Sequence, residues 1–188
     1  MKKSQRLIIF AVIALLVVTA GVYLLSQNGN SAEAAFLEQH GLDGLSVEEI
    51  VYKLDSTTAD PEGLSASITS DQLILNDGTH EVKLALPADK FYLSFAPYIT
   101  NTHPCATHSL ISCRGELAGE ELQAIITDTA GNEIVNDTFT TMENGFVGVW
   151  LPRDITATVT VLYNGLSAQA SVDTSKGSNT CLTTLQLN

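Results

Sequence analysis

The stretch QLILNDGTHEVKLALPADKFYLSFAPYI, Gln72 to Ile99, gives the clearest indication of β structure in this chain. Two apolar alternating runs flank Asn76-Asp77-Gly78, and turn residues in that position are typical of a β-hairpin. In the run that follows, Phe91, Leu93 and Phe95 fall on one side of an extended chain, because successive side chains of a strand point to opposite faces. The stretch therefore predicts a hairpin followed by a further strand.

Further strands of the same kind follow along the chain. Apolar runs recur in ELQAIITDTAGNEIVNDTFTT, GFVGVWLP, ITATVTVLYNGLSAQASV and CLTTLQL, and turn residues interrupt them at 129–132 and 163–165. Seven or eight strands at such spacing favour an antiparallel sandwich or barrel. We therefore expect residues 64–188 to form a β-sandwich domain that carries the cysteines and histidines discussed below.

A short helical module precedes these strands. Ser46 and Glu49 match the S-x-x-E capping box, and the apolar residues of VEEIVYKL then follow at helical spacing. The turn residues Asp60-Pro61-Glu62-Gly63 end the module. Residues 31–63 are thus expected to be a linker and a small helical module. The predicted fold class is α+β: this helical module followed by an antiparallel β-sandwich, preceded by one N-terminal transmembrane helix.

Residues 1–30 are expected to be a membrane anchor or an uncleaved signal. Basic residues precede LIIFAVIALLVVTAGVYLL, Leu7 to Leu25, which has nineteen residues and no charge. As a helix this run is about 28 Å long, close to the thickness of a bilayer core. Because basic flanks stay cytoplasmic, we expect a single-pass protein of the cell membrane with its bulk outside the cytoplasm. Cleavage after the A-x-A pattern of Ala32 to Ala34 gives the alternative, a secreted or periplasmic protein.

The exported part is strongly acidic. Six basic and 21 acidic residues follow position 30, a balance of −15. Nucleic acid is excluded as a partner because its recognition requires a basic surface. The acidic charge favours solubility and raises the concentration of metal cations near the surface.

The stretch NTHPCATHSLISC, residues 101–113, contains two of the four histidines and two of the three cysteines. His103 and His108 bracket Cys105, and Cys113 follows. Three interpretations are open: one structural disulfide with a leftover thiol, a metal site, and a thiol redox site. Imidazole and thiolate together suit copper and zinc, and thiolates prefer Cu(I) in particular.

The third cysteine, Cys181, opens the last predicted strand, far along the chain from the other two. A single soft pocket requires the fold to bring its sulfur beside those of the central loop. Two thiolates that form one disulfide release two electrons, which suffice to reduce two Cu(II) ions, and the third thiol and the histidines can then hold the product. The candidate redox-active residues are Cys105, Cys113 and Cys181. The candidate metal ligands are Cys105, Cys113, Cys181, His103 and His108.

Other site types are less well supported by the sequence. A blue-copper loop carries a methionine after its cysteine and histidine, and that methionine is missing here. No G-x-S-x-G, H-E-x-x-H or phosphate-loop motif is present, so no catalytic residue of a familiar enzyme is predicted. The rival functions are a metal-independent thiol–disulfide oxidoreductase or redox sensor, and a zinc-binding structural module.

At these residues the sequence resembles the CueP family of extracytoplasmic copper-binding proteins. The stretches that carry the resemblance are FYLSFAPYITNTHPCATHSLISCRGEL, residues 91–117, and CLTTLQL, residues 181–187. The likeness extends from about Phe36 to Leu187. It implies copper binding in the cell envelope, tolerance of excess copper and reduction of Cu(II) to Cu(I). It also implies that all three cysteines take the family's cysteine positions, with His103 and His108 beside them.

In Gram-negative members of the family, the resemblance further implies delivery of copper to a periplasmic Cu,Zn superoxide dismutase. The N-terminus departs from the soluble periplasmic members because it looks like a membrane anchor. This departure favours a Gram-positive cell surface over a dismutase partner.

Overall fold

The computed structural model describes residues 31–59, 61 and 63–188. The expected transmembrane helix within residues 1–30 lies outside these described residues. Within them, no helix is both long enough and apolar enough to cross a membrane. The chain divides into two compact units, one that ends at Asp43 and one that runs from Gly44 to Asn188. In the first unit, residues 31–39 are helical, and the rings of Phe36 and His40 lie 4.6 Å apart.

The second unit begins with helix α2 (Val47–Asp55). The predicted capping box is present: the Glu49 amide donates to Ser46 Oγ at 3.3 Å, and the Ser46 amide donates to Glu49 Oε2 at 2.7 Å. This confirms the helix start expected from the sequence. The buried apolar residues of the helix are Ile50, Val51 and Leu54. Asp55, the last residue of the helix, is buried as well, although it is acidic.

Four antiparallel strands form the first sheet, in the order β3-β2-β1-β5. They are β1 (Ser65–Ile68), β2 (Gln72–Asn76), β3 (Glu81–Ala85) and β5 (His108–Ser109). The hairpin expected around Asn76 joins β2 and β3. Its turn is closed by side chains, because the Gly78 amide donates to Asn76 Oδ1 at 2.6 Å and the His80 amide donates to Asp77 Oδ1 at 2.7 Å. Strand β5 lies within residues 101–113, the stretch with two cysteines and two histidines, which is called the Cys/His loop below. The first sheet therefore includes part of the Cys/His loop.

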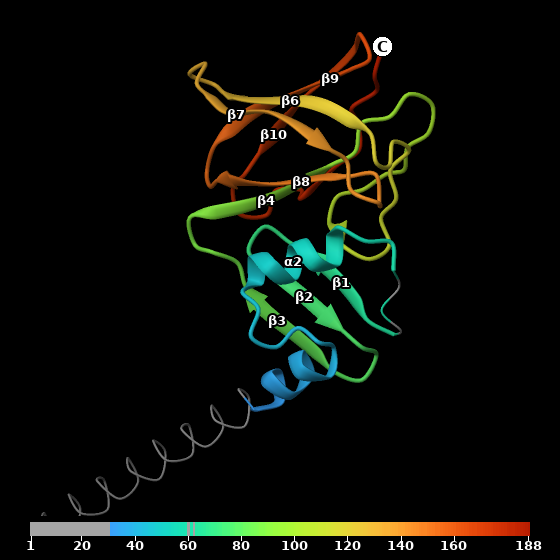
Figure 1. Ribbon diagram of the computed structural model, residues 1–188. Coiled ribbons are helices and arrows are strands. Elements are labelled where there is room, and N and C mark those ends of the chain that lie inside the picture. The colour runs from blue at the N-terminus through green and yellow to red at the C-terminus, as the bar shows by residue number, and fades with distance from the viewer. Residues whose placement is uncertain (1–30, 60, 62) are drawn as a thin grey trace, which may run out of the picture. The chain divides into compact units, whose positions relative to one another are not determined.

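Two further sheets form the expected sandwich, and Figure 1 shows them beyond α2 and the first sheet. The outer sheet has the order β10-β9-β6-β7 and the inner sheet has the order β11-β4-β8. The outer strands are β6 (Glu121–Asp128), β7 (Glu133–Thr140), β9 (Thr156–Tyr163) and β10 (Leu166–Asp173). The inner strands are β4 (Lys90–Phe95), β8 (Val147–Pro152) and β11 (Cys181–Leu182). The inner sheet is mixed, because β11 runs parallel to β4.

The core of the sandwich consists of the inward side chains of both sheets. Phe91 and Phe95 of β4 pack with Ile126 of β6 and Val159 of β9, and all four are fully buried. A two-residue turn joins β9 to β10, where Asn164 and Gly165 both have positive φ. An α+β fold with a sandwich, as the sequence predicts, is therefore confirmed.

Strand β4 is buried on both of its faces, which places the inner sheet in the middle of this unit. Phe91 and Leu93 point into the sandwich core, whereas Tyr92 and Ser94 are buried on the opposite face. That opposite face carries Tyr92 towards the C-terminal end of α2, where its hydroxyl meets Asp55. The back of the inner sheet is therefore a buried polar layer, and the candidate site residues lie there.

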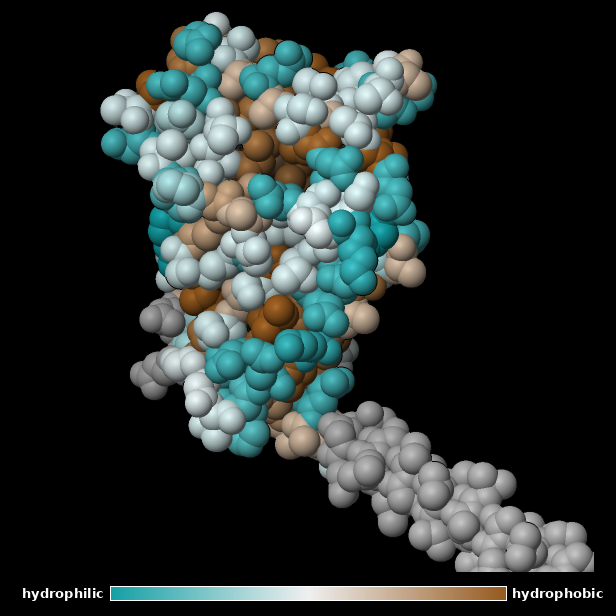
Figure 2. All heavy atoms as spheres, turned by 180° about the vertical axis from the view of Figure 1, so that it is seen from behind, coloured by the Kyte–Doolittle hydropathy of each residue, from teal (hydrophilic) through white to brown (hydrophobic). Residues whose placement is uncertain are grey.

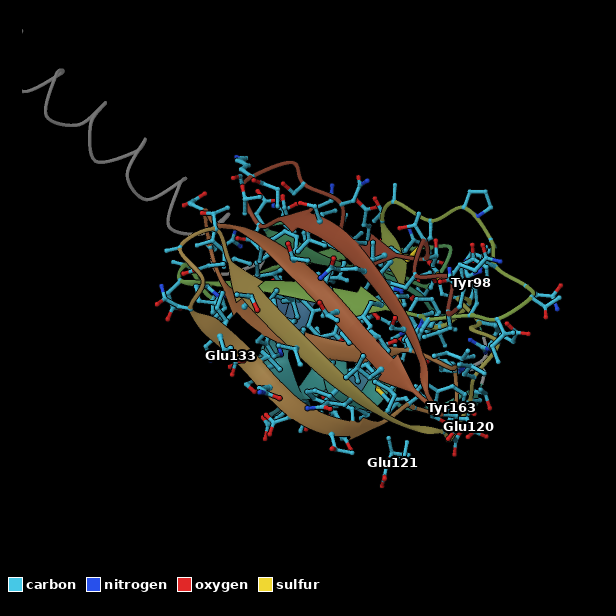
Figure 3. The ribbon with its side chains drawn as sticks, turned by 90° about the horizontal axis from the view of Figure 1, so that it is seen from above. Tyr98, Glu120, Glu121, Glu133 and Tyr163 are labelled. Atoms are coloured by element: carbon cyan, nitrogen blue, oxygen red, sulfur yellow. A yellow bond between two sulfur atoms is a disulfide. The ribbon has the colours of Figure 1, made fainter. Side chains whose placement is uncertain are left out.

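The outer sheet presents acidic side chains to solvent. Tyr163 Oη donates to Glu120 Oε2 at 2.9 Å, and Figure 3 shows these two side chains together at one end of the sheet. Glu121 and Glu133 are exposed and extend outward in the same view. Glu121 and Glu133 belong to the outer sheet, and none of the three cysteines lies in a strand of that sheet.

Candidate metal centre

The three cysteine sulfurs lie together. Cys105 and Cys181 form a disulfide across 76 residues of sequence, with their Cα atoms 5.6 Å apart. Cys113 is a buried free thiol whose Sγ lies 3.6 Å from Cys105 Sγ. A single site with three sulfur ligands requires Cys181, from the last strand, to lie beside Cys105 and Cys113. The fold places the three sulfurs together in this way.

Backbone hydrogen bonds fix the two segments that carry the disulfide. The Ala106 carbonyl accepts from the Thr180 amide at 3.0 Å and from the Cys181 amide at 3.2 Å. On its other side, β11 pairs with β4 through the Ser94 amide, which donates to the Thr180 carbonyl at 2.9 Å. The last strand therefore lies between the Cys/His loop and the middle of the inner sheet.

His108 is the nitrogen donor at this cluster. It is held in β5, where it pairs with Ile68 of β1, and its side chain is fully buried. His108 Nδ1 lies 3.7 Å from Cys181 Sγ. The sulfur atoms of the three cysteines and a ring nitrogen of His108 all lie within 4.8 Å of one another. With the Cys105–Cys181 disulfide reduced, these four residues could hold a metal ion.

His103 takes a different position from His108. It is half-buried and does not belong to the group of four residues. Its side chain hydrogen-bonds the Cys113 thiol, and its ring lies 6.2 Å from the ring of Phe146. The five residues singled out by the sequence therefore lie in one region, and His103 contacts Cys113 within it.

A buried carboxylate stands behind His108. His108 Nε2 lies 2.8 Å from Asp55 Oδ1, and neither side chain reaches solvent. The other carboxylate oxygen, Oδ2, accepts from Tyr92 Oη at 2.6 Å. Asn144 Nδ2 donates to Asp55 Oδ1 at 2.7 Å and to the Asp55 carbonyl at 2.6 Å. Buried polar groups of this kind are stable only when they are hydrogen-bonded, and here all of them are.

These contacts shift the pKa values of the groups at the centre. Burial alone would raise the pKa of the Cys113 thiol, but hydrogen bonds from His108, His103 and the Ser109 backbone lower it from 9.0 to about 7. For His108, burial acts to lower the pKa, whereas the hydrogen bonds to Asp55 and Cys113 raise it to about 9. Burial and the neighbouring Asp55 charge also raise the pKa of Tyr92 well above its usual 10.0. The pair formed by Cys113 and His108 thus favours thiolate and imidazolium near neutral pH.

Comparison with known proteins identifies the family. The family model described as periplasmic copper-binding protein CueP matches residues 49–186. This chain belongs to the CueP family. A crystal structure of S.CueP superposes with a TM-score of 0.80 at 49% sequence identity, covering 83% of this chain and 97% of that chain. No curated protein matches the chain.

In this CueP-family protein, Asp55, Tyr92 and Asn144 are candidate site residues that the sequence did not reveal. Asp55 had a local signal, because it stands four residues after the buried Val51 and so continues the apolar face of its helix. An acidic residue on an apolar helix face indicates a buried partner. Tyr92 and Asn144 had no such signal, since their roles depend on contacts made across the fold.

A cavity gives access to the disulfide of this CueP-family protein. It has a volume of about 430 Å³ and lies between the ends of β10 and β11, where Cys105, Val172, Asn179 and Cys181 line it. On the face drawn in Figure 2, hydrophobic side chains lie in a hollow of the sandwich, between more hydrophilic ones. Cys105 is the more accessible of the two bridged cysteines, because it is half-buried whereas Cys181 is only 4% exposed.

Proposed function

We propose that this protein binds copper outside the cytoplasm and reduces Cu(II) to Cu(I) with its thiols. The observation that carries the proposal is the gathering of three sulfurs and one imidazole nitrogen within 4.8 Å from segments far apart in the chain. Thiolate and imidazole are ligands that suit copper, and several thiolates favour Cu(I). Membership in a family described as copper-binding supports the choice of copper over zinc.

The proposed reduction uses the two cysteines that form the disulfide. The thiols of Cys105 and Cys181 lose two protons and two electrons as their S–S bond forms, and two Cu(II) ions each accept one electron to become Cu(I). Cys113 stays a thiol, and its lowered pKa makes its thiolate available to a metal. We assign the Cu(I) ligands of the oxidised protein to Cys113, His108 and His103, and we draw the Cu(I) ligands of the reduced protein from these residues together with Cys105 and Cys181.

Mass spectrometry tests the reduction directly. Reduced full-length protein that receives Cu(II) without oxygen is expected to lose two hydrogens per chain, while a Cu(I)-specific chelator counts two Cu(I) for each disulfide. Cys105→Ser and Cys181→Ser each abolish the intramolecular bridge between these positions. Cys113→Ser is the matched variant: it still forms the Cys105–Cys181 bridge but retains Cu(I) less tightly. An unchanged mass after Cu(II) addition would exclude the reduction.

A second candidate is thiol–disulfide exchange without a metal. It is favoured by the Cys113 thiol, which lies 3.6 Å from a disulfide sulfur and has a lowered pKa. Titration of the fully reduced protein with Cu(I) against a competing chelator separates the two functions. Copper binding that weakens in each single Cys→Ser variant supports the copper function, whereas a chain that binds no Cu(I) supports the exchange function.

The location and the recipient of the copper are part of the same proposal. The family description is periplasmic, and the Lys2-Lys3 and Leu7–Leu25 pattern supports export with a membrane tether. We propose that a copper-accepting protein of the cell envelope receives the Cu(I). In the reduced protein, where Cys105 is a proposed copper ligand, the accessible Cys105 at the cavity beside β11 is the point from which transfer would begin.

A further inference from the structure

We propose that Asp55 is a positioning residue for copper: it fixes the imidazole of His108 so that Nδ1, and not Nε2, faces the sulfurs. The inference rests on the proposed copper function and concerns how its nitrogen ligand is held. The two residues come from different parts of the fold, α2 and β5, and they are not neighbours in the sequence. Their contact is nevertheless short and closed to solvent, at 2.8 Å between Asp55 Oδ1 and His108 Nε2.

The chemistry of the contact determines where the ring proton lies. An ionised carboxylate only accepts hydrogen bonds, so the nitrogen that faces Asp55 must carry a proton. Nε2 therefore keeps its hydrogen whether the ring is neutral or charged. Nδ1, which lies 3.7 Å from Cys181 Sγ, is the nitrogen that can exchange a proton for a metal ion. A histidine that binds a metal through one nitrogen and a carboxylate through the other is a recurring arrangement in metal sites.

The carboxylate is itself held in place by donors from two other segments. Tyr92 Oη, from β4, donates a hydrogen bond to Asp55 Oδ2. Asn144 Nδ2 donates to both Asp55 Oδ1 and the Asp55 carbonyl. Asn144 in turn accepts from the Phe146 amide through Oδ1 at 2.9 Å. Because each of these groups has a partner, the carboxylate cannot turn away from His108 without leaving buried donors unpaired.

The ring of His108 is also restrained from its face. The Phe146 ring packs against it with centroids 4.7 Å apart and an interplanar angle of 47°. Phe146 is fully buried and belongs to the small apolar group around Cys113 and Cys181. The imidazole is therefore held by a hydrogen bond at one nitrogen and by packing on its face. Its Nδ1 atom stays directed at the sulfurs, so metal binding requires little rearrangement of this ligand.

The negative charge of Asp55 has a second effect on His108. A carboxylate at the far nitrogen of a metal-bound imidazole makes the ring a stronger donor, and loss of such a partner typically costs 10–100-fold in metal affinity. We therefore expect Asp55→Asn to weaken Cu(I) binding by roughly 10-fold or more. Asparagine keeps the size of the side chain but removes the charge and one acceptor.

A double-mutant cycle in the full-length, fully reduced protein tests whether Asp55 acts through His108. Cu(I) affinity is measured by chelator competition for the wild type, Asp55→Asn, His108→Ala and the double variant. We expect each single variant to bind Cu(I) more weakly and the double variant to bind no more weakly than His108→Ala alone. Losses that multiply, or an Asp55→Asn affinity equal to the wild type, would overturn the inference.

Tyr92→Phe is the matched control for disturbance of the buried network. It removes one hydrogen bond from the same carboxylate but leaves the contact between Asp55 and His108 intact. We expect Tyr92→Phe to lower the free energy of unfolding while leaving Cu(I) affinity within about threefold of the wild type, since the charge behind the imidazole remains. An equal loss of affinity in Tyr92→Phe and Asp55→Asn would show a general structural effect and would contradict the inference.

A measurement on the wild type keeps the inference testable if Asp55→Asn does not fold. Nitrogen-15 NMR of the histidine rings in the Cu(I)-loaded protein is expected to show a proton on Nε2 of His108 and a metal-dependent shift at Nδ1. A proton on Nδ1 with the metal-dependent shift at Nε2 refutes the assignment. Absence of any Cu(I) binding by the wild type would refute the proposed function itself. Cu(I) binding that His108→Ala leaves unchanged would refute only the inference about Asp55 and His108.

Discussion

Cys113 differs from the other two cysteines in being a free thiol with two histidines next to it. Hydrogen bonds from His108 and His103 outweigh the opposing effect of burial, so the pKa of this thiol falls to about 7. We expect the alkylation rate of the oxidised protein to rise about tenfold per pH unit up to about pH 7 and then to level off, because the thiolate is the reactive form. The rate of iodoacetamide labelling of Cys113, followed by mass spectrometry, measures this profile.

The control for this prediction removes one hydrogen-bond donor. His103→Gln leaves the group of four residues intact but lacks the imidazole that contacts Cys113, so its profile should level off at a higher pH than that of the wild type. An alkylation rate in the wild type that still increases steeply up to pH 9 would be inconsistent with the lowered pKa.

Residue types in the sequence indicated the candidate metal ligands but not the residues that hydrogen-bond to them. The spacing of His103, Cys105, His108 and Cys113 in one loop was visible in the sequence, because these residue types share a chemistry. Asp55 and Asn144 lie 89 residues apart and meet only through tertiary packing. No periodicity in the sequence encodes such a contact, so the network behind His108 required the structure.

Among the elements, β8 shows how a strand makes room for the site. Gly148 lies opposite Ser94 in the pairing with β4, and a Cβ at this position would overlap the side chain of Tyr92. We expect Gly148→Ala to destabilise the fold by about 1–3 kcal/mol, because an extra methyl group in a packed interior displaces its neighbours. Urea unfolding of the metal-free protein measures the change.

The same strand pair supplies a check on that prediction. Combined with Tyr92→Leu, which removes the crowded hydroxyl, Gly148→Ala should cost less than the sum of the two single changes. Strict additivity would show that the two side chains do not compete for space.

Local turn chemistry explains why some elements were predictable and others were not. The β2–β3 and β9–β10 hairpins follow from residues around Asn76 and Asn164 that favour tight turns, and both were expected. The pairing of β5 with β1 and the parallel pairing of β11 with β4 join segments that no turn connects. These two short pairings bring the ligands together, and they depend on the packing of the whole unit.

For the molecule as a whole, the Cys105–Cys181 disulfide closes a loop that spans 76 residues of the chain. Closing a loop of this length restricts the unfolded chain and stabilises the folded state by about 4 kcal/mol in the chain-entropy account. We therefore expect reduction to lower the free energy of unfolding by up to about this amount. Urea unfolding with and without a phosphine reductant measures the difference, and the reduced, metal-free protein is expected to remain folded through its sandwich core.

Two variants control for this prediction. Cys113→Ser retains the disulfide, so it should lose as much stability on reduction as the wild type does. The double variant Cys105→Ser/Cys181→Ser has Cys113 as its single cysteine and forms no bridge within the chain, so the reductant should leave its unfolding curve unchanged. Equal curves for the oxidised and reduced wild type would argue against a stabilising role for the bridge.

The candidate site residues come from five separate parts of the chain: α2, β4, the loop between β4 and β6, the segment before β8, and β11. A synthetic peptide that copies residues 101–113 would therefore carry only two of the three sulfurs, and its His108 imidazole would lack the Asp55 carboxylate. To build this site in another protein, the inner sheet and the buried polar layer on its back would have to be transferred together. The site is therefore a poor candidate for grafting as a short motif.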